Sequence, residues 1–313
     1  MSEILKVSGL VKRYKELIAL DNVNLSVKEG EIFGLLGPNG SGKSTTINCV
    51  LSLLEFDKGE ITIFGKNMAP KAYDIKKEIG VVPQEVAVYD TLTVYENIDF
   101  FCGLYIKDKK ERAKCVQDAI DFVALNDFVK FRPKKLSGGL KRRLNIACGI
   151  AHKPKLIFFD EPTVAVDPQS RNKILEGIEQ LRKSGATIVY TSHYMEEVEQ
   201  LCDRILIIDK GHVIAEGTID ELKGMIKKSE IITIETAGLD EDVMGRINDL
   251  SNVFNSEYKN GVLKVEAGAG KHNVIDIVNI LQDSGYSMKK IFSEQPTLND
   301  VFLELTGKEL RDD

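Results

Sequence analysis

The stretch LLGPNGSGKSTT, Leu35 to Thr46, carries three glycines, one lysine and four hydroxyl residues at the end of a short apolar run. Its key residues fall at the spacing G-x-x-x-x-G-K-[ST]: Gly37, Gly42, Lys43 and Ser44. Glycines let the backbone wrap closely around an anion, so that successive N–H groups point inward. A helix that starts at the end of such a loop adds the positive end of its dipole. The stretch therefore predicts a binding site for a polyphosphate.

The residues of this loop predict a nucleotide site. Lys43 would neutralise the β- and γ-phosphates, and the Ser44 hydroxyl would ligate Mg²⁺. The nucleotide-binding residues predicted from the loop are Gly37, Pro38, Asn39, Gly40, Ser41, Gly42, Lys43, Ser44 and Thr45. An ordinary glycine-rich turn is the alternative. The strand-like EIFGLL before the loop and the helical spacing of residues 44–54 after it are the context that the motif requires.

A second motif, LIFFDEP at residues 156–162, places two acids after four apolar residues. A buried parallel strand would deliver Asp160 to its carboxyl end, where ligands bind in open α/β sheets. There Asp160 would hold Mg²⁺ through water, and Glu161 would orient and deprotonate the attacking water. Taken alone, the motif is equally consistent with a strand followed by an acidic helix N-cap.

Two polar residues follow other predicted strands. His193 comes after ATIVYTS and could hydrogen-bond a γ-phosphate, whereas Gln84 comes after VVP. A histidine at a strand end is more often structural, and most glutamines are surface residues. Both assignments therefore depend on the family pattern described below.

A third stretch, LSGGLKRRLNIA at residues 136–147, offers another helix N-terminus to an anion. Its Ser137, Gly138 and Gly139 precede an amphipathic helix. A serine N-cap with a flexible entry is the alternative. The basic run at residues 141–143 admits contact with nucleic acid, but a solvated helix face is its commoner meaning.

The order of strands and helices predicts an α/β fold. Strand-like runs and helical stretches alternate through the first two thirds of the chain, which indicates a parallel sheet covered on both faces. Residues 86–152 are predominantly helical, and Thr93 with Glu96 forms a predicted capping box. Past Gly224 the order becomes βαββαβ with a tail helix, including a hairpin about residues 260–261, which predicts a small ferredoxin-like domain. We expect domains at 1–224 and 225–313.

Composition narrows the classes of protein further. The 313 residues carry a net charge of −6, so the net charge of the chain does not attract it to nucleic acid or acidic lipid. Five scattered cysteines fit no zinc or disulfide framework, which favours reduced thiols in a cytosol. The first residues lack the apolar core of a signal peptide, and no run approaches the about 18 apolar residues of a membrane helix. Any membrane role is expected to come through a partner.

These motifs, in this order, resemble the ATP-binding-cassette family of ATPases over about residues 4–223. The resemblance implies a P-loop NTPase fold, with a RecA-like parallel core, an antiparallel β subdomain and a helical subdomain. It matches residues 37–45 to the Walker A loop, 136–139 to the signature and 156–161 to the Walker B strand with the catalytic glutamate. It also matches Tyr14 to the aromatic that stacks on adenine, Gln84 to the Q-loop, Asp167 to the D-loop and His193 to the switch histidine.

The resemblance implies Mg²⁺ and ATP as ligands, with Ser44, Gln84 and Asp160 about the metal. It places Ser137, Gly138, Gly139 and Asp167 at the nucleotide of a second copy, because two cassettes of this family face head to tail. For Tyr14, a core tyrosine between strands is the alternative.

The single cassette, the KRRLNIA after the signature and the tail QPTLNDVFLELTGKEL resemble the drug-resistance branch of the family. That branch implies an exporter subunit, cytoplasmic and peripheral at the membrane, paired with a separate permease. Two residues depart from the pattern: Leu140 stands where many signatures have Gln, and Ala165 where Gly or Ser is usual. A soluble cassette ATPase acting on ribosome or nucleic acid is the main alternative. A regulator that binds nucleotide without turnover is a third.

Overall fold

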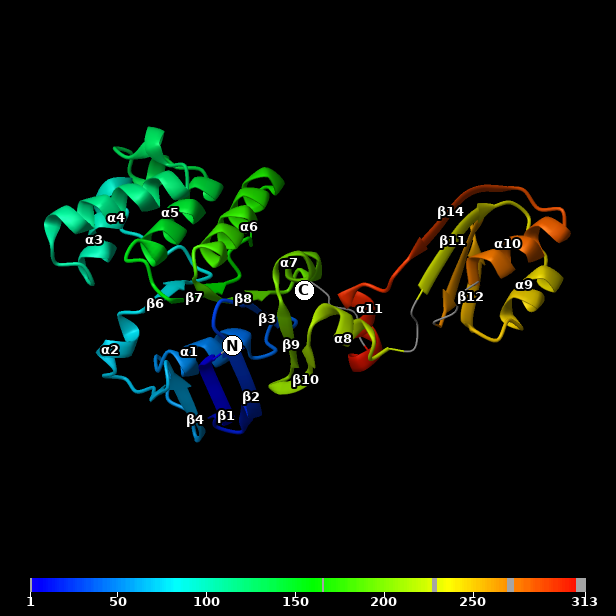
Figure 1. Ribbon diagram of the computed structural model, residues 1–313, viewed down its shortest axis with the longest axis horizontal. Helices are drawn as coiled ribbons and strands as arrows, with labels where there is room; N and C mark the ends of the chain where they lie inside the picture. Colours follow the sequence, from blue (N-terminus) through cyan, green and yellow to red (C-terminus); the bar gives the residue numbers. More distant parts are fainter. Residues whose placement is uncertain (1, 165, 227–229, 269–272, 308–313) are drawn as a thin grey trace. The chain divides into compact units, whose positions relative to one another are not determined.

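The structure, a computed structural model, describes residues 2–164, 166–226, 230–268 and 273–307 (Figure 1). These residues form two compact units, and the division falls between Thr218 and Ile219. Ala165 and the last residues of the tail, 308–313, lie outside the described residues. Among the described residues, no helix is both long and apolar enough to cross a bilayer.

The first unit contains an antiparallel sheet with the strand order β2-β1-β4-β5. Its strands are β1 (Glu3–Tyr14), β2 (Leu17–Lys28), β4 (Lys58–Ile63) and β5 (Lys66–Asn67). Along β2, Val23, Leu25 and Val27 are buried and alternate with more exposed residues, as expected where one face meets a core. That face packs into a core shared with β3 (Ile32–Leu36) and α1 (Lys43–Val50).

A six-stranded sheet forms the centre of the same unit, in the order β10-β9-β3-β8-β7-β6. Its other strands are β6 (Ile79–Val82), β7 (Leu156–Asp160), β8 (Thr187–Ser192), β9 (Arg204–Asp209) and β10 (His212–Gly217). All neighbours pair in parallel except β9 and β10, which form an antiparallel hairpin around Lys210-Gly211. Strands β3 and β8 are buried throughout; β3 is apolar along its length, whereas β8 is apolar at its centre and ends in two hydroxyl residues. The predicted parallel core is confirmed.

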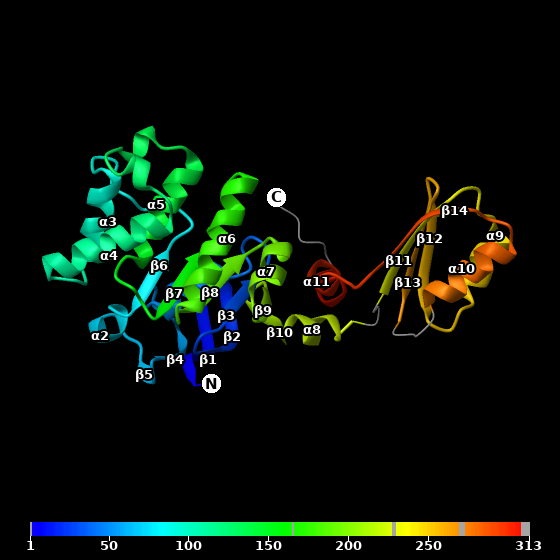
Figure 2. The same cartoon turned by 45° about the horizontal axis from the view of Figure 1, so that its top comes forward.

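The parallel pairing gathers three strand ends at one edge of this sheet. Leu36, the last residue of β3, pairs with Ser192 of β8, and Asp160 at the end of β7 pairs with Thr191. The loops that follow these strands therefore start side by side (Figure 2). This is the edge at which an open α/β sheet binds its ligands.

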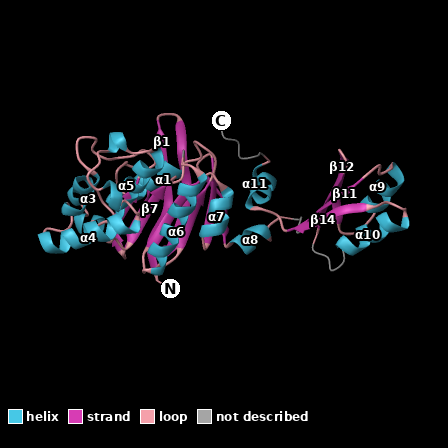
Figure 3. Ribbon diagram, turned by 90° about the horizontal axis from the view of Figure 1, so that it is seen from above, coloured by secondary structure: helices cyan, strands magenta, loops and turns pink. Residues whose placement is uncertain are grey.

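Helices complete the first unit. Helices α3 (Val94–Gly103), α4 (Lys109–Phe122) and α5 (Gly138–Ile150) pack on one another and form the predicted helical subdomain (Figure 1). The predicted capping box is present, because Thr93 accepts from Glu96 N–H and Glu96 accepts from Thr93 N–H. The remaining α-helices of this unit that the structure describes are α2 (Tyr73–Lys76), α6 (Pro168–Lys183) and α7 (Met195–Leu201). Figure 3 shows α6 and α7 in front of the strands of the first unit, and α7 packs on β3 and β8.

One helix is shorter than expected. Residues 44–54 have helical spacing, but α1 ends at Val50. Ser52 adopts a left-handed backbone with φ of 49°, which stops the helix.

The second unit has the predicted ferredoxin-like order. Its elements are α8 (Ile219–Lys223), β11 (Glu230–Thr236), α9 (Glu241–Asn248), β12 (Val253–Lys259), β13 (Val262–Ala267), α10 (Asn273–Asp283), β14 (Met288–Glu294) and α11 (Leu298–Thr306). The sheet order β12-β13-β11-β14 places the first strand of the motif between the third and the fourth. Asn260 and Gly261 both have positive φ, 53° and 80°, which is the turn expected between β12 and β13.

Candidate functional site

The glycines of the loop after β3 are needed by its geometry. Gly40 and Gly42 have φ of 75° and 113°, a region that glycine enters without steric cost. At Gly37 a Cβ atom would lie 2.2 Å from the carbonyl oxygen of Ile208, so a side chain has no room. Gly42 is the N-cap of α1 and supplies no side-chain cap, which leaves the first amides of the helix available to an anion.

Lys43 lies under this loop and is 5% exposed. Its Nζ donates to the carbonyl oxygens of Gly37 and Pro38, at 2.8 and 3.1 Å. The same Nζ is 3.2 Å from Oε1 of Glu161. The residue predicted to bind phosphate and the residue predicted to activate water are therefore ion-paired.

Glu161 is the residue at which the predictions converge. Its side chain is almost fully buried, and Oε2 accepts from Nε2 of Gln84 at 3.1 Å. The Nδ1 of His193 lies 3.3 Å from the same oxygen. Three residues predicted from three separate stretches, Lys43, Gln84 and His193, thus meet at the carboxylate of a fourth. The lone-histidine and surface-glutamine alternatives leave this convergence unexplained.

The backbone at Glu161 is held in an unusual conformation. Its φ is 46°, in the left-handed region that non-glycine residues rarely adopt. Thr191 fixes it, because the Glu161 N–H donates to the Thr191 carbonyl oxygen at 3.2 Å and to its Oγ1 at 3.0 Å. The Thr191 hydroxyl in turn donates to Oδ1 of Asp160 at 2.6 Å. Sequence reasoning missed Thr191, although the apolar-to-polar change within VYTS marks the end of the strand.

A cavity of about 530 Å³ opens over the loop and Glu161. Its predicted lining residues are Tyr14, Asn39, Gly40, Gly42, Lys43, Ser44, Thr45, Gln84 and Glu161. Leu17, Ile18, Ala19 and Lys210 also line it and were not predicted. Tyr14 is 46% exposed, so the alternative of a core tyrosine is wrong. The Nζ of Lys12 lies 4.9 Å from the centroid of its ring.

The signature residues and Asp167 do not line this cavity. Ser137 caps α5 by accepting the N–H of Leu140 at 3.3 Å, as its N-cap alternative requires. Gly138 is exposed, and a Cβ there would meet no atom within 4 Å. At Gly139, by contrast, a Cβ would lie 2.8 Å from Ser170 Oγ and 3.3 Å from Asp167 Oδ2. The signature therefore packs against the start of α6, away from its own chain's cavity.

Asp167 is the N-cap of α6. Its Oδ1 accepts the N–H of Ser170 at 3.0 Å, and this bond holds the pKa of the Asp167 carboxyl below its usual value.

The basic run beside the signature, residues 141–143, differs from a solvated face. Arg142 is 6% exposed and donates from Nη1 to the Pro83 carbonyl oxygen at 3.0 Å, and burial lowers its pKa. The expectation of a solvated face is wrong for this residue.

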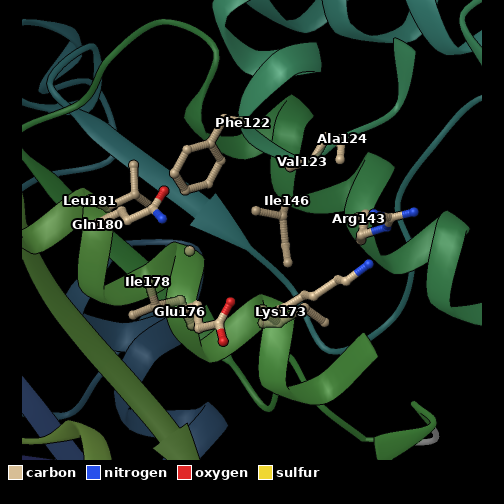
Figure 4. Close-up of a pocket in the computed structure, with 12 residues that line it drawn as sticks. Phe122, Val123, Ala124, Arg143, Ile146, Lys173, Glu176, Ile178, Gln180 and Leu181 are labelled. Carbon is tan, nitrogen blue, oxygen red and sulfur yellow. The ribbon is translucent and has the colours of Figure 1, made fainter. Parts of the chain in front are cut away.

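A smaller cavity of about 180 Å³ lies between α4, α5 and α6 (Figure 4). Gly177 leaves room for the ring of Phe122, whose Cζ would lie 3.2 Å from a Cβ at that position. Arg143 and Lys173 lie on the same side of the view in Figure 4. None of the predicted nucleotide or metal residues lines this cavity.

The chemistry of the larger cavity fits a nucleotide with its magnesium ion. Ser44 and Gln84 line the cavity, and Asp160 ends β7 directly before Glu161; they supply hydroxyl, carboxamide and carboxylate oxygens, the hard donors that Mg²⁺ prefers. Ser41 Oγ is buried and has no hydrogen-bond partner among the residues that the structure describes, as expected of an atom that a bound phosphate would satisfy. The uncapped amides of α1 and the Lys43 ammonium supply the positive charge that balances a polyphosphate.

Comparison with known proteins decides the family. The family model described as ABC transporter matches residues 20–164, and one described as the ATP-binding protein DrrA1-3-like C-terminal domain matches residues 217–306. The linearmycin resistance ATP-binding protein LnrL of Bacillus subtilis (strain 168) is 40% identical over 312 residues, which cover 99% of this chain and 100% of that protein. The chain belongs to the ATP-binding proteins of ABC transporters.

Other members of the family extend the match. The daunorubicin/doxorubicin resistance ATP-binding protein DrrA of Streptomyces peucetius is 34% identical, covering 97% of this chain and 92% of that protein. A solved ATP-binding cassette, dimeric and bound to ADP and Pi in a post-hydrolysis state, superposes with a TM-score of 0.63 at 30% identity. The match covers 68% of this chain and 98% of the cassette. The chain is an ABC-type ATPase of the DrrA-like branch.

Proposed function

We propose that this ABC protein hydrolyses ATP as a head-to-tail homodimer and thereby drives export through a separate membrane permease. The observation that carries the proposal is the convergence of Lys43, Gln84 and His193 on Glu161 at the mouth of a nucleotide-sized cavity. Such an arrangement suits a carboxylate that orients and deprotonates water beside a γ-phosphate.

The residues of the cavity divide the work of binding and hydrolysis. Tyr14 lines the cavity and would stack on the adenine, and the loop amides with Lys43 would bind the phosphates. When bound, Mg²⁺ neutralises charge on the phosphate oxygens, and Ser44, Gln84 and Asp160 are the residues that would hold it. A γ-phosphate is the competing partner for Lys43 Nζ, so nucleotide binding would free the Glu161 carboxylate to accept a proton from water. His193 would hold the γ-phosphate from the β8 side.

The position of the signature supports the proposed homodimer. Ser137, Gly138 and Gly139 lie outside their own chain's cavity, and Gly138 presents an open, exposed surface at the start of α5. A second copy in head-to-tail orientation would place this helix N-terminus on the γ-phosphate of the first, and the two-fold contact would be isologous. ATP would then favour the closed pair, and hydrolysis would remove that preference.

The permease is proposed from the family and from the surface beside Gln84. Tyr89, Tyr95 and Phe100 are each at least 40% exposed in the helical subdomain that follows Gln84. Exposed aromatic residues are typical of surfaces that receive a partner. Several relatives are named as resistance or export proteins, among them a Nod factor export ATP-binding protein of Rhizobium meliloti (strain 1021). We place the chain at the cytoplasmic face of a membrane through that partner.

The dimer is tested with two glycine variants in a Glu161→Gln background. A Glu side chain at Gly138 meets open space within one chain, yet it would add bulk and negative charge where the partner's phosphate must fit. Gly138→Glu should abolish dimer formation at saturating Mg·ATP while ATP binding by each chain persists. Gly245→Glu is the matched control, because that helical glycine in α9 also faces open space.

Size-exclusion chromatography with light scattering reads the result. The parent Glu161→Gln chain and the Gly245→Glu variant should elute as dimers with Mg·ATP and as monomers without it. A parent that stays monomeric both alone and with its co-purified integral-membrane partner would overturn the proposal. An ATP-dependent affinity for RNA that falls with salt would favour the ribosome-type alternative instead.

A further inference from the structure

Glu197 is a buried carboxylate to which no step of hydrolysis has been assigned. It lies on α7, is 3% exposed, and is surrounded by polar groups from three other segments. Its Oε2 accepts from the Tyr190 hydroxyl at 2.6 Å, from Thr163 Oγ1 at 2.8 Å and from Ser192 Oγ at 3.3 Å. Its Oε1 lies 3.1 Å from Nε of Arg171.

Three of these partners, Thr163, Ser192 and Arg171, lie within four residues of a residue of the proposed site. Thr163 follows Glu161 by two positions, and Ser192 directly precedes His193. Arg171 lies on α6 one turn after its N-cap, Asp167. One carboxylate therefore ties together the segments that carry the proposed base, the D-loop aspartate and the switch histidine.

The backbone around His193 is held from both sides by this cluster. The Tyr194 N–H donates to Ser192 Oγ at 2.9 Å, and the Arg171 guanidinium lies 4.6 Å from the centroid of the Tyr194 ring. The Tyr194 ring is in turn 4.2 Å from the His193 ring. Burial, with a contribution from Glu197, raises the pKa of Tyr190, so its hydroxyl remains a donor.

The cost of such a cluster argues for a purpose beyond packing. A buried ion pair is often no more stabilising than apolar side chains of the same volume, because both charges lose their hydration. Its advantage is directional: three hydroxyl donors orient the carboxylate, and through it the loops, in one geometry, while the Arg171 guanidinium balances its charge. A misplacement of about 1 Å at a reacting group can cost on the order of a hundredfold in rate.

We infer that Glu197, paired with Arg171, is a positioning residue for ATP hydrolysis that sets the His193 segment relative to Asp167 and Glu161. It touches neither the nucleotide nor the attacking water. The inference rests on the proposed roles of Glu161, Asp167 and His193. In the closed dimer, any shift of the Asp167 loop at the partner surface would reach His193 through Arg171 and Glu197.

The test is the steady-state ATPase activity of the full chain with Glu197→Gln, which keeps the shape and the acceptor oxygen but removes the charge. We expect kcat to fall about tenfold to a hundredfold, with KM for ATP within about twofold because no nucleotide contact is lost. Glu196→Gln is the matched control, since Glu196 is the exposed neighbour on the same helix. It should leave both parameters unchanged.

Arg171→Gln keeps the inference testable if Glu197→Gln fails to fold. It should lower kcat in the same way, and the double variant should be no slower than the slower single variant, because both changes break one pair. A Glu197→Gln chain that is folded and as fast as Glu196→Gln would overturn the inference, as would two fully additive single effects. A wild-type chain without ATPase activity would instead contradict the proposed function.

Discussion

Lys43 Nζ and Glu161 Oε1 lie 3.2 Å apart, and both side chains are almost fully buried. Lys43, the proposed phosphate ligand, and Glu161, the proposed base for water, thus neutralise each other's charge. Nucleotide must compete for Lys43, and the negative charge of Glu161 opposes the arriving γ-phosphate. The two residues therefore have opposite expected effects on ATP affinity.

Replacing Glu161 with Gln should raise ATP affinity and stop turnover. The amide removes the charge that repels the γ-phosphate and releases Lys43 from its ion pair, while its oxygen can still accept from Gln84 Nε2. We expect turnover to fall by about 10²–10⁴-fold, the usual contribution of a general base. Equilibrium binding of a fluorescent ATP analogue and phosphate release measure the two effects. Unchanged turnover would remove Glu161 from the role of base.

Replacing Lys43 with Ala should weaken ATP binding by at least about tenfold, because a charge-assisted contact contributes roughly 1.5–3 kcal/mol. It also leaves the buried Glu161 without its cation, so repulsion of the phosphate grows. Lys173→Ala is the control, since Lys173 lines the separate cavity between α4, α5 and α6. Isothermal calorimetry should find the control at wild-type affinity. A Lys43→Ala chain of normal affinity would contradict the phosphate-loop assignment.

Two glycines of one loop should respond differently to alanine. At Gly37 the added methyl group would lie 2.2 Å from the Ile208 carbonyl oxygen and 2.6 Å from Ser41 Oγ. The loop backbone would therefore have to move away from Ile208 to accommodate it. At Gly40 the methyl group meets nothing within 4 Å, and the cost is the left-handed backbone alone, about 1 kcal/mol. Gly37→Ala should abolish ATP binding, whereas Gly40→Ala should bind and show a modest fall in thermal midpoint. Equal effects would show that space at Gly37 does not decide the loop's shape.

The sequence predicts those parts of the site best in which a motif fixes both the residue type and the backbone conformation. The loop at residues 37–45 and the acids after β7 were found because glycine spacing and a strand end determine their positions. The contact of Gln84 and His193 with one oxygen of Glu161 could not be deduced from pattern, since it depends on the register of β6, β7 and β8. Thr191 and Glu197 were missed for the same reason. Single polar residues at a strand end or on a short helix look ordinary until the sheet brings their partners close.

Cysteine ionisation should make the folded chain less stable in alkali. Burial raises the pKa of both Cys49 and Cys102 to about 11, from a model-compound value of 9.0. Thiols that stay neutral in the folded chain ionise first in the unfolded chain, so this contribution is fully present below pH 9.0 and is lost as pH rises towards 11. The free energy of unfolding in urea should fall between these pH values. The fall should be shallower for Cys49→Ala/Cys102→Ala, and an identical slope would show that these thiols do not contribute.

Truncation should separate the nucleotide site from the second unit, provided that the cut falls after Thr218. Every residue placed at the site lies before that point, up to Lys210. A cut after Gly224 would keep α8 without α11, the helix it packs against, and would expose Leu222, which is fully buried in the whole chain. We therefore expect residues 1–218 to bind ATP with the affinity of the full chain and to remain monodisperse. The 1–224 form should also bind ATP, but its molecules should associate with one another through the exposed apolar face of α8. Loss of ATP binding in both truncated forms would mean that the second unit is needed to fold the first.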